Sequence, residues 1–240
     1  MLGKLLYTEW IKLKKSKVLQ ILYISPILST VSAYFTFIDF PGNQWMNSFY
    51  AMIMVQAVLF LPLLAGLFSA AVCRYEHAEG EIWKQLLALP VNRIQVYSSK
   101  YIIVCLFVAL TQILLLVGLF LVGLVHGYND PFPWQGVLVR LFMGWLGCLP
   151  IIALQLWVST AWSSFAAPVA LNVILTLPNI LIANSEKFGP WYPWAQPFLG
   201  MVLEQQSGFT FSIETLVFVI VGGCVIFTLG GLVYFQRKAV

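Results

Sequence analysis

The side chains that could carry out bond chemistry are few and stand far apart in the sequence. The only histidines are His77 and His126, and the two aspartates, Asp39 and Asp130, fall in short loops between apolar stretches. Hydrolysis inside a membrane would need a nucleophile beside a base, or two acids at one depth. The four cysteines show no C-x-x-C spacing and no nearby histidines, which argues against a metal site. We therefore expect no catalytic residue and no metal ligand.

Nucleotide chemistry is not expected of the chain itself either. A P-loop cradles phosphates with the pattern G-x-x-x-x-G-K-[ST], and the only Gly-Lys pair here is Gly3-Lys4. The apolar stretches also lack the charged ring of an ion channel and the buried acid of an ion-coupled carrier. The sequence thus predicts a protein that is not an enzyme and binds no cofactor of its own.

The composition indicates an integral membrane protein. Of the 240 residues, 60% are hydrophobic and 9% are charged, and the mean hydropathy is +0.88. Soluble domains carry about 25% charged residues, so a soluble enzyme, a disordered chain and a secreted disulfide scaffold are excluded. The net charge of +4 arises from basic residues beside apolar stretches. We expect the partner of that charge to be anionic lipid and not nucleic acid.

The expected architecture is an all-α membrane protein with six transmembrane helices in one domain, residues 1–240. A crossing needs about 20 mostly apolar residues. Six stretches qualify, at roughly 18–38, 48–73, 101–125, 137–160, 165–183 and 213–235. The fourth and fifth are separated only by Ala161-Trp162-Ser163-Ser164, so a tight reversal is required there. Four prolines inside these spans are expected to kink them: Pro62, Pro150, Pro168 and Pro178.

The basic residues predict that both termini are cytoplasmic. With six crossings, eleven of the thirteen Lys and Arg residues fall on the side of the termini. Only Arg140 and Lys187 fall on the other side. Cytoplasmic loops carry an excess of Lys and Arg, which sets the orientation.

Two segments outside the spans are expected to lie at the membrane surface. Residues 1–17 place apolar side chains on one helical face and lysines elsewhere, which predicts an inner interfacial helix. Residues 184–212 are rich in Trp, Tyr, Phe and Pro, and such aromatic rings prefer the headgroup level. We expect that outer segment to lie on the membrane or to re-enter it as short helices.

Residues 75–90, between the second and third spans, have a pattern typical of a short amphipathic helix. Its apolar face is Tyr75, Ile82, Trp83, Leu86 and Leu87, and its polar face is Glu76, Glu81 and Lys84. Pro90 would end the helix. A rigid helix here could push on both neighbouring spans, but a solvated linker would show similar periodicity, and the pattern alone leaves both readings open.

This inner loop resembles the signature of ABC-2 type permeases. The similarity lies in Glu79-Gly80, in the run Leu86-Leu87-Ala88-Leu89-Pro90-Val91, in Arg93, and in Tyr97 and Lys100 at the entry to the third span. The six-span plan with an amphipathic N-terminal helix is also similar to that family. The chain length and the LALPV-x-R form resemble the branch of lantibiotic and peptide-antibiotic immunity exporters.

The resemblance implies that residues 75–90 are a coupling helix that docks into a separate ATPase subunit, where ATP and Mg bind. The implied coupling residues are Glu76, Glu79, Gly80, Ile82, Trp83, Leu86, Leu87, Pro90 and Arg93. Trp162 and Ser163, in the short inner turn, would form a second contact, although this turn has almost no charge.

Five uncharged polar residues lie at membrane depth: Gln56, Gln112, Gln155, Asn172 and Asn179. Each needs a partner across a helix interface or in a cavity. Packing is the default explanation, and lining of a transport pathway is the alternative. Arg140 is close enough to the outer end of its span to reach the headgroups, which predicts a lipid-facing anchor.

Together these observations predict the permease subunit of an exporter in the bacterial cytoplasmic membrane. Its expected partners are an ATPase dimer, a second permease chain, identical or related, and the lipid bilayer. The expected cargo is an amphiphilic, membrane-inserted antimicrobial peptide. The alternatives are another ABC-2 cargo, such as a drug, lipid or glycan, or a membrane scaffold or receptor that transports nothing.

Overall fold

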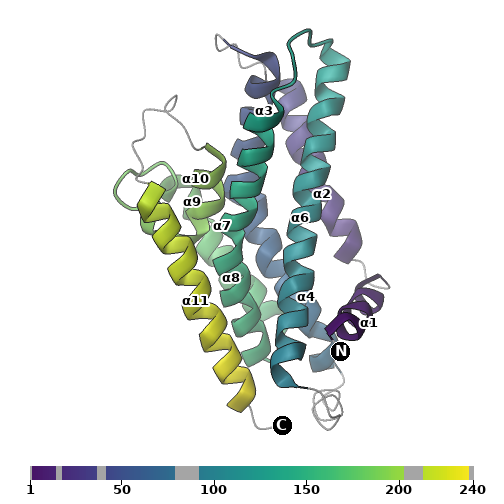
Figure 1. Cartoon of the computed structure of the whole chain (residues 1–240), viewed down its shortest axis with the longest axis vertical. Coiled ribbons are helices and arrows are strands. Elements are labelled where there is room, and N and C mark those ends of the chain that lie inside the picture. The colour runs from purple at the N-terminus through teal and green to yellow at the C-terminus, as the bar shows by residue number, and fades with distance from the viewer. Residues whose placement is uncertain (1, 15–17, 37–41, 79–91, 203–212, 238–240) are drawn as a thin grey trace.

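The computed structural model describes residues 2–14, 18–36, 42–78, 92–202 and 213–237, and all regular secondary structure within them is helical. Figure 1 shows a bundle whose long helices run along one axis, with the N- and C-terminal ends both at the lower end. The helix α1 (Leu2–Lys14) lies across the foot of the bundle and packs mainly on α6. The long elements are α2 (Val18–Phe35), α3 (Gln44–Val55), the π-helix η1 (Gln56–Phe60), α4 (Leu61–Ala78), α6 (Arg93–His126), α7 (Trp134–Ala161) and α11 (Ile213–Arg237).

Five helical stretches of the described chain are long and apolar enough to cross a membrane. They are Val18–Phe35, Gln44–Glu76, Arg93–His126, Trp134–Ala161 and Glu214–Arg237. The predicted multi-pass helical membrane protein is thereby confirmed, and five of the six expected spans have a helix of crossing length. The remaining one, expected at 165–183, consists of two short apolar helices, α8 (Ala166–Thr176) and α9 (Asn179–Ile182), with Pro178 between them.

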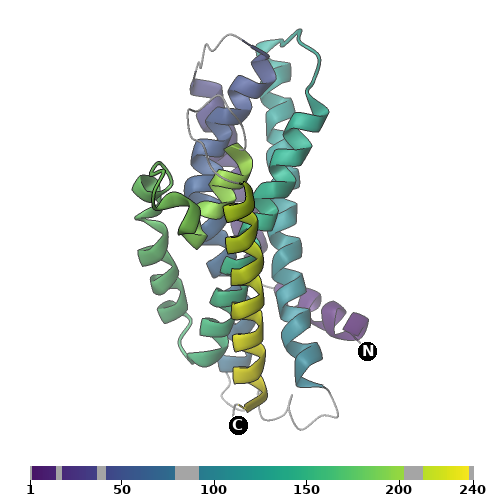
Figure 2. The same ribbon diagram turned by 60° about the vertical axis from the view of Figure 1, so that its left-hand side comes forward.

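The outer segment expected at the membrane surface folds, over the residues that the structure describes, into three short helices. They are η2 (Gly189–Trp191), η3 (Pro193–Ala195) and α10 (Gln196–Val202). Residues 196–201 are all buried, and α10 packs mainly on α7. Figure 2 shows this segment beside the upper part of the bundle, below the top of α6.

The second span changes its helical geometry halfway. Pro62 has no backbone N–H, so the carbonyl of Val58, four residues earlier, loses its α-helical donor. One residue before the proline, the N–H of Leu61 reaches the carbonyl of Gln56, five residues back, which closes the π-helix η1. The side-chain amide of Asn179 donates to the Val58 carbonyl at 2.7 Å. A residue of α9 thus supplies the hydrogen bond that the proline removes. Pro150, by contrast, lies inside an uninterrupted α7.

The upper connection between α6 and α7 fixes the start of α3. Gly127, with φ +66°, ends α6 in the left-handed conformation that glycine adopts without strain. Asp130 then accepts a hydrogen bond from the backbone N–H of Gln44 at 2.8 Å, and its carbonyl accepts one from the indole of Trp45. An acid at a helix N-terminus is favourable because it satisfies unpaired N–H groups.

Candidate functional site

The most unusual feature of the molecule is a group of four charged side chains at its lower end, three of them buried and Lys12 partly exposed, which we call the ionic cluster: Glu9, Lys12, Glu76 and Lys100. The ammonium nitrogen of Lys100 lies 2.7 Å from Oε1 of Glu76 and 3.1 Å from Oε1 of Glu9. Lys12 approaches the same two carboxylates at 2.9 and 3.2 Å. Two acids and two bases therefore balance each other in charge.

Three helices bring the ionic cluster together. Glu9 and Lys12 are one turn apart on α1, Glu76 is in the last turn of α4, and Lys100 is in the second turn of α6. An acid near a helix C-terminus faces the negative end of the helix dipole. Glu76 is stable there because both lysines contact it. The ionic cluster thus joins helix α1 to α4 and α6, the two spans that flank residues 79–91.

The burial of these charges requires close pairing. Lys100 and Glu76 are both 0% exposed, and Glu9 is 5% exposed. Lys100 also donates to the carbonyl of Val72 at 3.0 Å, so three acceptors match the three protons of its ammonium group. A buried ion that loses its partner keeps its desolvation penalty without compensation. The ionic cluster is therefore a stable connection only while all four members remain in place.

The position of Glu76 corrects the sequence interpretation. We expected it on the polar face of a separate helix over 75–90, available to an ATPase. Instead α4 continues to Ala78, and Glu76 is fully buried against α1 and α6. The amphipathic pattern predicts a solvent-exposed face for any acid. Glu76 is buried instead, because Lys12 and Lys100 neutralise its charge.

Glu9 belongs to the site and was missed by the sequence reasoning. A signal was present: Leu5, Glu9 and Leu13 follow each other at intervals of four, so that the acid lies on the apolar face of its helix. An acid in that position must be buried beside a cation or exposed at an interface. Lys100, which we noted only as part of the family signature, is that cation.

The structure describes only some of the other implied coupling residues. Residues 79–91, which include Glu79, Gly80, Ile82, Trp83, Leu86, Leu87 and Pro90, lie outside the described residues. Arg93 begins α6 and donates to the carbonyl of Gln236 at 2.8 Å, which ties α6 to the end of α11. Trp162 and Ser163 are exposed in the turn after α7, at the lower end.

The polar residues at membrane depth join helices inside the bundle. Asn172 of α8 is the most connected: its Nδ2 donates to the carbonyls of Pro62 and Leu63, and its Oδ1 accepts from Gln155 and Trp194. It therefore links α8 to the broken second span, to α7 and to η3. A Cβ on Gly66 would lie 2.2 Å from this amide, so the close approach requires glycine.

The remaining polar residues are likewise buried and bonded between helices. Gln56 accepts from the hydroxyl of Ser29 at 3.0 Å, and Gln112 donates to the carbonyl of Leu141 at 3.2 Å. Together with Asn179, described above, these contacts are the interhelical packing that we considered the default. Their lining of a pathway stays a prediction.

Arg140 also departs from expectation, since it does not face the lipid. It is 8% exposed, its Nη2 donates to the hydroxyl of Tyr50 at 3.3 Å, and its guanidinium lies over the same ring. A planar guanidinium stacks on aromatic faces and loses its hydration readily, so it is buried between α3 and α7.

The fold and this site define a multi-pass helical membrane protein whose buried charges connect its spans at one end. A comparison with protein families matches residues 5–179 to the family described as ABC-2 family transporter protein. The match covers well over half of the chain, so the protein belongs to this family and is a permease component. A comparison with curated proteins found no match.

Proposed function

We propose that the chain is the permease subunit of an ATP-binding cassette exporter that uses ATP hydrolysed by a separate subunit. The observation that carries this proposal is the placement of the ionic cluster. The segment that resembles a coupling helix, residues 75–90, includes Glu76, whose carboxylate is held by Lys100 of α6 and Lys12 of α1. Force applied to residues 79–91 would therefore reach two spans and the interfacial helix at once.

The proposed orientation puts the lower end of the bundle in the cytoplasm of a bacterial cell. Support comes from the described basic residues of that end, which are Lys4, Lys12, Lys14, Arg74, Arg93, Lys100 and Arg237. The described loops of the upper end carry only Lys187. Basic residues are retained on the cytoplasmic side.

In the proposed mechanism, closure of an ATPase dimer displaces the coupling segment, and the ionic cluster carries α1, α4 and α6 with it. The second span is broken at η1 and Pro62, so its lower half can tilt relative to α3. A second permease chain, identical or related, completes the pathway. Rigid-body tilting of such elements alternates access between the two sides. Trp162 and Ser163 provide a further contact for the ATPase.

The proposed cargo is an amphiphilic molecule, and an antimicrobial peptide already inserted in the membrane suits the chain best. The spans carry few charges, and Arg140, in the upper half of α7, is already engaged by Tyr50. An amphiphilic cargo that enters sideways from the lipid, with its apolar part in the bilayer, needs no charged binding site within the spans. Drugs, lipids and glycans carried by other ABC-2 exporters are the alternatives, as is a scaffold or receptor.

Mild detergent extraction of the tagged chain from its native membrane tests the proposal. We expect an ATP-binding cassette ATPase to co-purify, identified by mass spectrometry, and its substrate-stimulated hydrolysis to be lost in Glu79→Lys or Gly80→Pro. Lys187→Gln, a charge change at the upper end, is the control and should leave the activity unchanged. If no ATPase were retained by the unaltered chain, the scaffold or receptor function would be favoured instead.

A further inference from the structure

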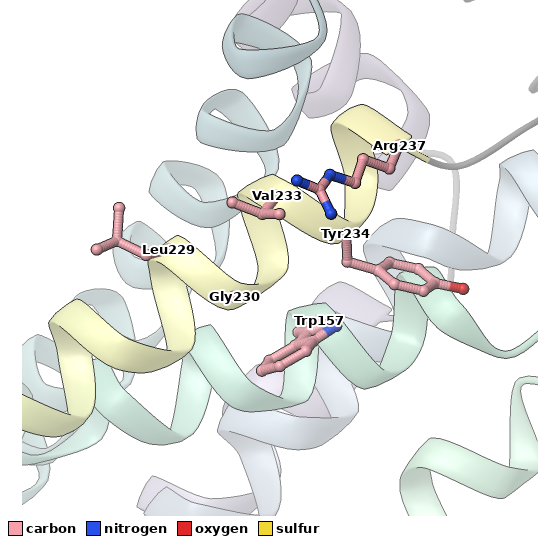
Figure 3. Close-up of a pocket in the computed structure, with 6 residues that line it drawn as sticks. All are labelled: Trp157, Leu229, Gly230, Val233, Tyr234 and Arg237. Carbon is pink, nitrogen blue, oxygen red and sulfur yellow. The ribbon is translucent and has the colours of Figure 1, made fainter.

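A groove opens between α7 and α11 near the lower end of the bundle. Its volume is about 490 Å³, and it is lined by Trp157 of α7 and by Leu229, Gly230, Val233, Tyr234 and Arg237 of α11. Figure 3 shows the indole of Trp157 beneath Gly230, with Leu229 and Val233 along α11 and the guanidinium of Arg237, from the last turn, folded back beside Val233. The volume falls within the range of about 300–1,000 Å³ that is typical of small-molecule sites.

Two glycines create the close helix crossing beside this groove. A Cβ on Gly230 would lie 2.5 Å from the Trp157 ring, and one on Gly231 would lie 2.1 Å from the hydroxyl of Tyr97. Side chains at these positions would hold α11 away from α7 and from Tyr97 of α6. The groove forms because Gly230 packs its backbone directly on the ring of Trp157 and has no side chain to fill the space beside it.

The chemistry of the groove changes along its length. Leu229 and Val233 are apolar and exposed, at 56% and 45%, and the other exposed side chains of α11 between Val217 and Val233 are apolar too. The last turn then presents Arg237, which is exposed, and the ion pairs found among the described residues do not include it. A ligand that fits has an apolar chain and an anionic head at the level where α11 leaves the membrane.

We propose that the groove binds one anionic phospholipid, with an acyl chain over Gly230 and Trp157 and the phosphate beside Arg237. This inference goes beyond the proposed transport function, because it assigns a structural lipid to the crossing of α7 and α11. Basic residues beside a membrane surface attract anionic lipid, and Tyr234 has the amphipathic side chain that prefers the headgroup level.

A second copy of this chain is a poorer occupant for reasons of charge. A two-fold contact along α11 would bring the same surface of both copies together, and Arg237 of one copy would then approach Arg237 of the other. The described part of the lower half of α11 contains no acid that could compensate them. Like charges opposed in this way disfavour the contact.

Photocrosslinking in vesicles tests this site without the ATPase. The full chain, with p-benzoylphenylalanine in place of Leu229, is reconstituted in equal amounts of phosphatidylglycerol and phosphatidylcholine, and the adducts are identified by mass. We expect phosphatidylglycerol adducts to exceed phosphatidylcholine adducts about fivefold, the factor that one basic residue near an anionic surface supplies. Arg237→Gln should bring that ratio to about one, whereas Lys187→Gln should not change it.

A second pair of variants tests the apolar part of the groove. Val233→Phe enlarges a side chain on the wall of the groove and should reduce the yield of both lipid adducts severalfold. Val217→Phe, an exposed position near the other end of the same helix, is the control and should leave the yield unchanged. Equal adducts of the two lipids in the otherwise unaltered chain would overturn the proposal. So would a predominance of cross-linked chain dimers, because a second copy would then occupy the groove.

Discussion

Replacement of Lys100 with methionine is expected to destabilise the lower end of the bundle strongly. Methionine keeps most of the length of the side chain but leaves Glu76, at 0% exposure, with Lys12 as its remaining cation. Removal of one partner from a buried ion pair costs about 3–5 kcal/mol. Because the Lys12 side chain is 24% exposed and still contacts both acids, we expect the lower part of that range, about 3 kcal/mol.

The charge balance of the ionic cluster predicts partial rescue by a second change. Lys100→Met leaves a net charge of −1 in the buried group, and Glu76→Gln alone leaves +1. The double variant retains Glu9 and Lys12, which are 3.2 Å apart, and is neutral again. Its loss of stability should fall short of the sum of the two single losses by about 1–3 kcal/mol, which is the scale of coupling between contacting residues.

Thiol exposure on heating provides the assay. Cys73, Cys105 and Cys148 are buried in the native fold, so a fluorogenic maleimide should report unfolding of the purified chain in detergent. One kcal/mol corresponds to about 2–4 °C in a chain of this size, so Lys100→Met should unfold about 6–12 °C below the unaltered protein. Lys14→Met, an exposed change on α1, should shift the midpoint by no more than about 2 °C.

Two results would refute this reasoning. If Lys100→Met unfolded at the same temperature as the unaltered chain, the buried pairing with Glu76 would be incorrect. If the losses of Lys100→Met and Glu76→Gln were simply additive, the two side chains would not interact, and α4 would not be joined to α6 through this ion pair.

Three further predictions concern the rest of the fold and use the same thermal assay unless stated. Asn172→Leu removes the donor to two carbonyls and the acceptor of two more bonds, and should lower the free energy of unfolding by about 2–4 kcal/mol. Asn184→Leu, an exposed control, should lower it by less than about 1 kcal/mol. Equal losses in the two variants would contradict the account. Gly66→Ala should be destabilising by about 1–3 kcal/mol because its Cβ would overlap that amide, and a neutral result would mean that α4 and α8 are farther apart than described. Asp130→Ala should cost about 1 kcal/mol and accelerate hydrogen exchange at the Gln44 amide; unchanged exchange would show that the carboxylate is not bound there.

The long helices could be predicted from the sequence because hydrophobic runs are a local property. The helices expected at 137–160 and 213–235 are found at Trp134–Ala161 and Ile213–Arg237. The third began eight residues before its expected start, at Arg93. Its first turns contain serines, a tyrosine and a lysine, which lowered the apparent hydropathy although the fold buries several of them.

The ionic cluster could be predicted only in part, because burial of charge depends on partners distant in the sequence. Glu9 and Lys100 are 91 residues apart, and no local pattern relates them. The same holds for Asn179, whose bond to the Val58 carbonyl spans 121 residues. The sequence could indicate that Pro62 disturbs its helix, but not which side chain would satisfy the carbonyl that the proline leaves without a donor.

The central claim, that an external ATPase acts on this bundle through residues 75–90, is tested most directly by photocrosslinking from position 83. The full chain, with p-benzoylphenylalanine in place of Trp83, is irradiated in native membranes, and the adducts are identified by mass spectrometry. The account predicts an adduct with an ATP-binding cassette ATPase that depends on intact Gly80. An adduct only with lipid, the absence of any adduct, or labelling of position 83 by an impermeant reagent applied outside the cell would contradict it.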